Sequence, residues 1–256
     1  MAEKLTPEKI EEAAKHYENI TSGKTPILDK EQGLLKEQQP ILDSQAKPLK
    51  DMHEHLKKKD PNAYPLIPPT DPRLLMKIAP YTDDMLKEFK IEDRKDLSKK
   101  MYNSMVKYGG IGLSCNQVGL PYRMFVMGGH PQIEDGKVRN CFNPVIKDLS
   151  EETVLMKEGC LSYPFLFLSI SRPKWVNVQY SDENGETVEE YLHGMSARIF
   201  QHENEHMNGY VFTDLVSKMK LERGKKAQSK LIKQTIRNQQ QRLRNEVATK
   251  NENISE

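Results

Sequence analysis

The stretch Gln201-His202-Glu203-Asn204-Glu205-His206 lies within residues 195–208, a run with the spacing of a helix. Two histidines four residues apart lie on one face of an α-helix, so both imidazoles can reach one metal ion. Glu203 lies about 100° around such a helix from His202, where it can accept a proton from a water molecule. The stretch therefore predicts a metal-binding helix of the H-E-x-x-H kind. Two solvated histidines on a polar face are the alternative.

A hydrolytic metal site needs a third protein ligand and an open position for water. We prefer Cys160, which lies in Glu158-Gly159-Cys160-Leu161-Ser162 at the end of a predicted strand. Gly159 would let the backbone approach a ligand or metal closely. A small buried apolar residue is the alternative for any one cysteine. The residues alone leave open other ligands, namely Cys141, Cys115, His193 and several carboxylates.

A glycine-rich stretch, Gly110-Ile111-Gly112-Leu113-Ser114-Cys115-Asn116-Gln117, precedes both motifs. It lacks the full G-x-G-x-x-G pattern, so it does not indicate dinucleotide binding. We expect its glycines to let a substrate backbone approach. The Gln117 amide is a candidate donor to a developing oxyanion. A simple loop with two glycines is the alternative.

The patterns around these motifs predict an α+β domain. Residues 82–108 have helical spacing with a break near 91–93. Asp182-Glu183-Asn184-Gly185 is a hairpin turn signal. Short runs rich in Val, Ile, Phe and Tyr predict strands at 122–128, 140–146, 153–158, 165–171, 174–181 and 186–193. Consecutive short strands before one helix indicate antiparallel β-sheets packed around a central metal-binding helix, with helical N- and C-terminal extensions.

Composition divides the chain into three parts. Residues 1–66 form a polar, partly helical extension and linker, with helices expected at 7–20 and 47–59 and extended chain in the proline-rich 61–72. Residues 67–217 form the catalytic domain. Residues 218–256 form a basic tail with 11 Lys and Arg against 4 Asp and Glu, helical over 218–249.

The composition also bears on the compartment. Three cysteines without a C-x-x-C pair do not indicate a disulfide framework, so a reducing environment is expected. The N-terminus resembles neither a secretory signal nor a transit peptide. No run approaches the ~20 apolar residues that span a bilayer. We therefore expect a cytoplasmic, host-cell or organellar interior location and no secretion.

The three motifs, in this order, resemble those of the peptide deformylases. That family carries G-Φ-G-Φ-A-A-x-Q, E-G-C-L-S and Q-H-E-x-x-H, which here read Gly110 to Gln117, Glu158 to Ser162 and Gln201 to His206. The resemblance covers roughly residues 70–217. It implies removal of the N-formyl group from the formyl-methionine of newly synthesised polypeptides. A related peptidase with a His or Glu as third ligand and a non-enzymatic ribosome-associated protein are the competing readings.

The resemblance also implies the site. One divalent metal, natively Fe2+ with Zn2+, Ni2+ or Co2+ as substitutes, would be held by Cys160, His202 and His206. Metal-bound water would attack the formyl carbon, with Glu203 as general base and then acid. The Gln117 side chain and the Leu161 backbone N–H would hold the formyl oxygen. The substrate methionine would be bound by Ile111, Gly112, Met156, Met195 and Ile199.

Further residues are of interest beside this site. We hypothesise that Glu158 and Arg172 pair and fix Cys160, and two unrelated surface charges are the alternative. Ser114-Cys115 replaces the two alanines of the family pattern, and Cys115 is expected to be a second, oxidisable thiol near the metal. Phe167 stands where many bacterial relatives place an arginine that contacts the peptide.

The basic charges of 218–250 suit contact with a phosphate backbone. The resemblance adds a partner, because bacterial members dock on the ribosome through a C-terminal helix. Residues 218–256 hold no aromatic side chain, which argues against stacking on single strands, and few apolar ones, which argues against membrane insertion. DNA is not an expected partner. A solubilising charged helix is the alternative, and for 1–66 a solvated appendage.

Overall fold

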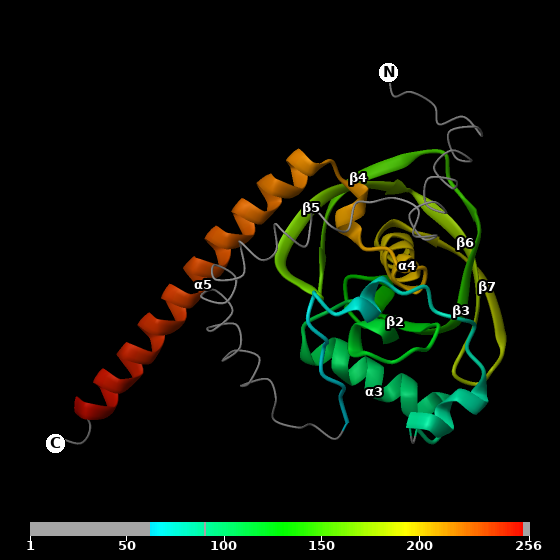
Figure 1. The fold of residues 1–256 in the computed structure, drawn as a ribbon, viewed down its shortest axis with the longest axis horizontal. Helices are drawn as coiled ribbons and strands as arrows, with labels where there is room; N and C mark the ends of the chain where they lie inside the picture. Colours follow the sequence, from blue (N-terminus) through cyan, green and yellow to red (C-terminus); the bar gives the residue numbers. More distant parts are fainter. Residues whose placement is uncertain (1–61, 90, 253–256) are drawn as a thin grey trace. The chain divides into compact units, whose positions relative to one another are not determined.

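The computed structural model describes residues 62–89 and 91–252 (Figure 1). The helices expected at 7–20 and 47–59 lie outside the described residues. Helices and 3₁₀ helices of the described part are η1 (Pro72–Leu75), η2 (Asp83–Phe89), α3 (Arg94–Lys107), η3 (Cys115–Val118), η4 (Glu134–Gly136), α4 (Gly194–Met207), η5 (Phe212–Leu215) and α5 (Lys218–Glu252). The strands are β1 (Gly112–Ser114), β2 (Met124–Gly128), β3 (Val138–Leu149), β4 (Thr153–Cys160), β5 (Tyr163–Pro173), β6 (Trp175–Ser181) and β7 (Thr187–His193).

The strands form two antiparallel sheets. Five strands pair in the order β1-β2-β3-β6-β7, and β4 pairs with β5 in a separate hairpin. The α+β class with antiparallel sheets is therefore confirmed, and each of the six predicted strands is present with shifted ends. The sequence does not predict β1, because three residues inside a glycine-rich motif give no alternation of polar and apolar side chains.

The helix α4 lies in the middle of the domain, with strands of both sheets around it (Figure 1). It buries ten of its 14 residues, far more than the single apolar stripe of a surface helix. Phe200 packs edge-on against Phe125 of β2 at 5.1 Å between ring centroids, and it also contacts Tyr180 of β6. These aromatic contacts tie α4 to the five-stranded sheet and fix which of its faces is left for the β4–β5 hairpin.

The segment before α3 departs from the prediction. The break expected near 91–93 is present, and the Asp93 side chain caps α3 by accepting from the Asp96 N–H. Residues 83–89, however, form the 3₁₀ helix η2, so the helical spacing predicted there gives a 3₁₀ helix and not an α-helix. Seven residues are too few for an α-helix to gain cooperative stability, and beyond their end Ile91 N–H donates to Leu86 O.

The helix α5 begins against the β4–β5 hairpin. Gly224 lies directly over Leu168, since a Cβ at this position would stand 2.6 Å from the Leu168 Cδ2 atom. Four residues on, Gln228 donates to the Pro164 carbonyl at 2.8 Å. The helix predicted at 218–249 is confirmed. No helix in the described part of the chain combines the length and apolar composition that a bilayer span requires.

The proline-rich segment contacts the domain through residues near its middle. Tyr64 and Leu66 pack against the core cluster that contains Leu97 and Tyr122. Ile67 N–H donates to the Gln117 carbonyl at 2.9 Å. Contact with the domain thus begins at least three residues before residue 67, where composition places the domain's start.

Candidate metal centre and active site

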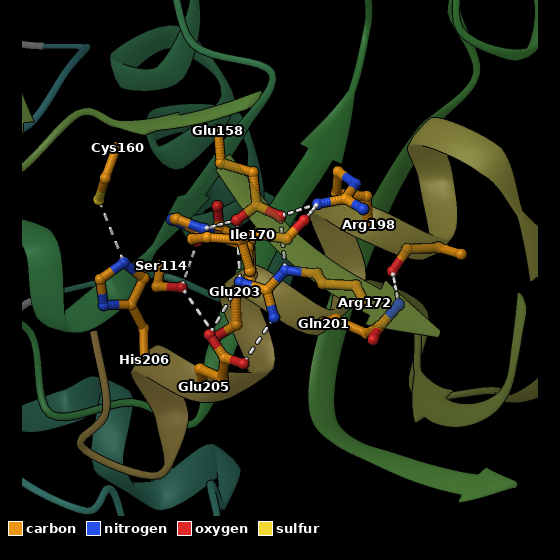
Figure 2. Close-up of polar contacts among 12 residues, drawn as sticks. Ser114, Glu158, Cys160, Ile170, Arg172, Arg198, Gln201, Glu203, Glu205 and His206 are labelled. Carbon is orange, nitrogen blue, oxygen red and sulfur yellow. Dashed lines mark hydrogen bonds and ion pairs between the residues drawn. The ribbon is translucent and has the colours of Figure 1, made fainter. Parts of the chain in front are cut away.

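Cys160, His202 and His206 come together where the end of β4 meets α4. Their ligand atoms all lie within 4.8 Å of one another, and Cys160 Sγ lies 3.3 Å from His206 Nε2 (Figure 2). The two histidines are adjacent because they are one helical turn apart, and their rings meet edge-on at 5.2 Å between centroids. One thiolate and two imidazoles are a donor set that suits Fe2+, Zn2+, Ni2+ or Co2+, so these residues fit a divalent metal.

The electrostatics around the two histidines support this fit. Burial opposes protonation of His202, but hydrogen bonds with Cys160 and Glu158 raise its pKa well above the ordinary value, so its surroundings favour positive charge. Burial lowers the pKa of His206 well below its usual range, which keeps that imidazole neutral. Among the described residues, the Nδ1 atom of His206 has no hydrogen-bond partner. A bound cation would supply the positive charge that the surroundings of His202 favour. The neutral imidazole of His206 could bind that cation, because metal ligation requires an unprotonated ring nitrogen.

Glu158 is the centre of a buried ionic network behind these ligands (Figure 2). It accepts from Arg172 at 2.6 and 2.9 Å and from Arg198, and it lies 3.2 Å from His202 Nδ1. Arg172 also donates to Glu205 at 2.6 and 3.0 Å. Burial opposes ionisation of Glu158, but the hydrogen bonds from His202 and Arg172 lower its pKa to about 2. The ionised carboxylate therefore fixes the ring of His202.

The hypothesised pair of Glu158 and Arg172 is thus present. Its direct contact is with His202, because Glu158 Oε2 lies 3.2 Å from His202 Nδ1. Among the described residues, no hydrogen bond joins the pair to Cys160 as hypothesised. Arg198 and Glu205 complete the network, and sequence reasoning missed both. The spacing Arg198, His202, Glu205 on one helix face was the available signal.

Glu203 is buried beside the cluster, with 4% of its surface exposed. Burial raises the pKa of its carboxyl above the ordinary value, against the opposing effects of the His202 charge and a hydrogen bond from Ser114. Ser114 Oγ donates to Glu203 Oε2 at 2.6 Å. Ile199 and Glu203 occupy the space over Gly112, where a Cβ would collide with both. The glycine expected to admit a substrate backbone therefore makes room for the carboxylate.

Gln117 lies beside the sulfur of Cys160. Its Nε2 donates to Ser162 Oγ at 3.0 Å and lies 3.4 Å from Cys160 Sγ, while its Oε1 accepts from the Ser114 N–H at 2.8 Å. Leu161 follows Cys160 directly, and its side chain packs against the core cluster that contains Leu97 and Tyr122. The structure thus brings the Gln117 amide to the ligand cluster.

The four apolar residues predicted to bind the substrate methionine have different surroundings. Ile199 is buried and Ile111 half-buried in the same core cluster. Met156 is half-buried on β4, opposite Ile170 of β5. Met195 is exposed in the first turn of α4.

Two expectations from the sequence are wrong. Gly159 does not make room for a ligand, because a Cβ there would lie 2.8 Å from the ring of Phe167, its cross-strand neighbour. Cys115 is not an accessible second thiol. It is fully buried in the core with its Sγ 3.6 Å from Met124 Sδ, and burial raises its pKa far above the usual range, so the reactive thiolate is suppressed.

A buried carboxylate beside a Cys-His-His cluster, on a helix enclosed by antiparallel sheets, defines a candidate hydrolytic metal centre. The sequence profile of the polypeptide deformylase family matches residues 64–222. Peptide deformylase of Thermotoga maritima is 41% identical over 129 residues, which are 50% of this chain and 76% of that protein. The Fusobacterium nucleatum enzyme is 34% identical over 154 residues, covering 57% and 86%.

Solved structures agree. The peptide deformylase of Thermus thermophilus superposes with a TM-score of 0.57 at 32% identity, over 67% of this chain and 99% of that one. That of Ehrlichia chaffeensis gives 0.56 at 33%, over 68% and 97%. The chain therefore belongs to the polypeptide deformylase family. It is a hydrolase of protein N-terminal processing.

Proposed function

We propose that this chain removes the formyl group from the N-terminal formyl-methionine of newly synthesised polypeptides with one divalent metal ion. The observation that carries the proposal is the convergence of Cys160, His202 and His206 within 4.8 Å beside the buried Glu203. The family resemblance implies Fe2+ as the native metal, and Zn2+, Ni2+ or Co2+ would also suit one thiolate and two imidazoles. When bound, the metal would lower the pKa of a water molecule towards 7 and polarise the formyl group.

Glu203 would act as the proton carrier. It takes the proton of the attacking water and returns it to the leaving amine. A pKa raised by burial suits this task, since the group must both accept and release a proton near neutral pH. The Gln117 Nε2 and the Leu161 backbone N–H would donate to the oxygen on which negative charge develops.

The ionic network holds the site in shape. Glu158 fixes the His202 ring, and Arg172 and Arg198 balance the carboxylate charge. For the substrate, we propose that Ile111, Gly112, Met156, Met195 and Ile199 surround the methionine side chain, as apolar groups suited to a thioether.

Outside the catalytic domain, we propose two further assignments. The exposed basic side chains of α5 would contact ribosomal RNA, which would place the enzyme where nascent chains emerge. Such a role requires a compartment in which polypeptides are synthesised, such as the cytoplasm. Within the N-terminal extension 1–66, we propose that catalysis does not require the part before Tyr64, because Tyr64 and Leu66 pack against the domain core.

The decisive experiment measures formate released from a formyl-methionine tripeptide by anaerobically purified full-length protein with its metal content determined. We expect one metal ion per chain and release of formate. Cys160→Ala should lose the metal, whereas Glu203→Ala should keep the metal and lose turnover. Metal binding without formate release from the wild-type protein would contradict the proposed reaction. Absence of metal would contradict the ligand set.

A further inference from the structure

The side chain of Ser114 contacts the carboxylate that the proposed reaction uses. Ser114 is fully buried, its hydroxyl donates to Glu203 Oε2 at 2.6 Å, and its oxygen lies 3.3 Å from the Glu203 carbonyl oxygen (Figure 2). A hydroxyl can donate only one proton. Of the two acceptors, the carboxylate oxygen is nearer and charged, so it is a stronger acceptor than the carbonyl oxygen. The proton of Ser114 is therefore directed to the carboxylate.

The two carboxylate oxygens of Glu203 consequently differ. Oε2 is held by Ser114, whereas Oε1 lies over Gly112, in space that any Cβ at 112 would occupy. Among the described residues, no hydrogen bond reaches Oε1. One oxygen is anchored, and the other is left to exchange a proton.

Ser114 also holds the Gln117 amide. Its backbone N–H donates to Gln117 Oε1 at 2.8 Å, which directs the Gln117 Nε2 toward Ser162 and the Cys160 sulfur. The backbone of Ser114 thus holds Gln117, the proposed donor to the oxyanion, and its side chain holds Glu203, the proposed proton carrier.

We propose that Ser114 is a positioning residue whose hydroxyl holds Glu203 in one rotamer, with Oε1 available for the proton. This inference rests on the proposed function. The family pattern has alanine at this position, and a methyl group cannot donate a hydrogen bond. The contact is therefore a departure of this chain from that pattern. Partners that orient a group of a metal site typically change activity by at least tenfold when removed.

The kinetic test compares Ser114→Ala and Ser114→Cys with Cys115→Ala. The thiol of Ser114→Cys fills the space of the hydroxyl but is a weak donor. Cys115→Ala is the matched control, because it also replaces a fully buried side chain by the second alanine of the pattern, and that side chain contacts Met124. We expect both Ser114 variants to lower kcat about tenfold with KM within twofold, and the control to stay within about twofold of wild type.

A second test uses metal-free protein and no activity. Removing the hydrogen bond by Ser114→Ala should lower Tm by about 4 °C more in the wild-type background than in Glu203→Ala, where the acceptor is already gone. Equal Tm shifts in both backgrounds would show that the Ser114 hydroxyl does not form this hydrogen bond with Glu203. Suppose that wild type releases formate. Unchanged kcat in Ser114→Ala, or a loss of kcat in Cys115→Ala as large as in Ser114→Ala, would then refute the positioning role of Ser114 but not the proposed function. No formate release by wild type would refute the proposed function and this role together.

Discussion

The helices α4 and α5 carry their charges in opposite settings. In α4, the charged or titratable Arg198, His202, Glu203 and His206 are buried, and each has a defined neighbour among the site residues. In α5, every described lysine and arginine from Lys218 to Arg237 is exposed. A buried charge depends on one or two partners, and losing a partner leaves it uncompensated. Exposed charges are screened by salt and act as a group.

Among the variants that test this contrast between α4 and α5, the one in α4 should show the largest effect. Glu203→Ala removes the proposed proton carrier but none of the three ligands. We expect kcat for formate release to fall about 10³-fold, while one metal ion per chain remains. Steady-state kinetics and metal analysis on the same preparation test this. A loss below tenfold would mean that another group takes the proton.

The next largest effect should be the loss of stability when a buried ion pair is removed, compared with removal of an exposed ion pair nearby in the sequence. Arg172→Leu leaves the carboxylates of Glu158 and Glu205 without their shared partner, and we expect about 3 kcal/mol lower free energy of unfolding. Lys174→Leu removes an exposed pair with Glu152 and should cost at most about 1 kcal/mol. Urea unfolding of metal-free protein measures both. Equal losses would show that burial does not decide the outcome.

Acid should act on partly buried charges as well. Burial disfavours ionised Glu190, but hydrogen bonds from Arg139 and Tyr180 lower its pKa from 4.5 to about 2. A lowered folded-state pKa gives stability that is present above pH 4.5 and lost as the pH falls toward 2. We expect Glu190 to contribute about 2–3 kcal/mol to that loss.

The free energy of unfolding, followed by urea titration between pH 6 and pH 2, should fall less steeply in Glu190→Gln than in wild type. Glu222→Gln on α5 is the control, because Glu222 is 63% exposed. A Glu190→Gln curve parallel to that of wild type would show that this carboxylate is not coupled to Arg139.

The smallest effect on turnover should come from α5. Replacing Lys226, Lys230 and Lys233 together by Glu should change tripeptide turnover less than twofold and the free energy of unfolding by at most about 0.5 kcal/mol per site. Binding to ribosomes should weaken and lose part of its salt dependence. Lys→Arg at the same positions keeps the charge and should bind as wild type does. Unchanged binding by the Glu variant would remove the proposed role of α5.

The features that the sequence predicted are those with a local cause. His202 and His206 are four residues apart, so helix geometry alone places them together, and the Asp182-Gly185 turn signal joins two strands that are neighbours in the chain. Cys160 came from its motif and the family resemblance, since no local rule links a strand end to a helix 42 residues later.

The features that were missed depend on contacts between distant elements. Gly159 was read as making room for a ligand, whereas the register of β4 with β5 places Phe167 over it. Arg198 reaches Glu158 only because the β4–β5 hairpin packs on α4. The buried environment of Cys115 depends on the whole core cluster that also contains Leu97 and Tyr122. Periodicity within one segment carries no information about such contacts.

Gly112 contributes no side-chain atom to the chemistry, yet Glu203 and Ile199 fill the volume into which a Cβ would project. Even alanine would push the carboxylate away from Ser114 or displace α4 from β1. In a mutational scan, residue 112 should therefore tolerate as little change as Glu203 itself. Such a position does not tolerate substitution because a neighbouring side chain fills the space that a Cβ would need. A map of sensitive positions would therefore overstate the number of residues that take part in the reaction.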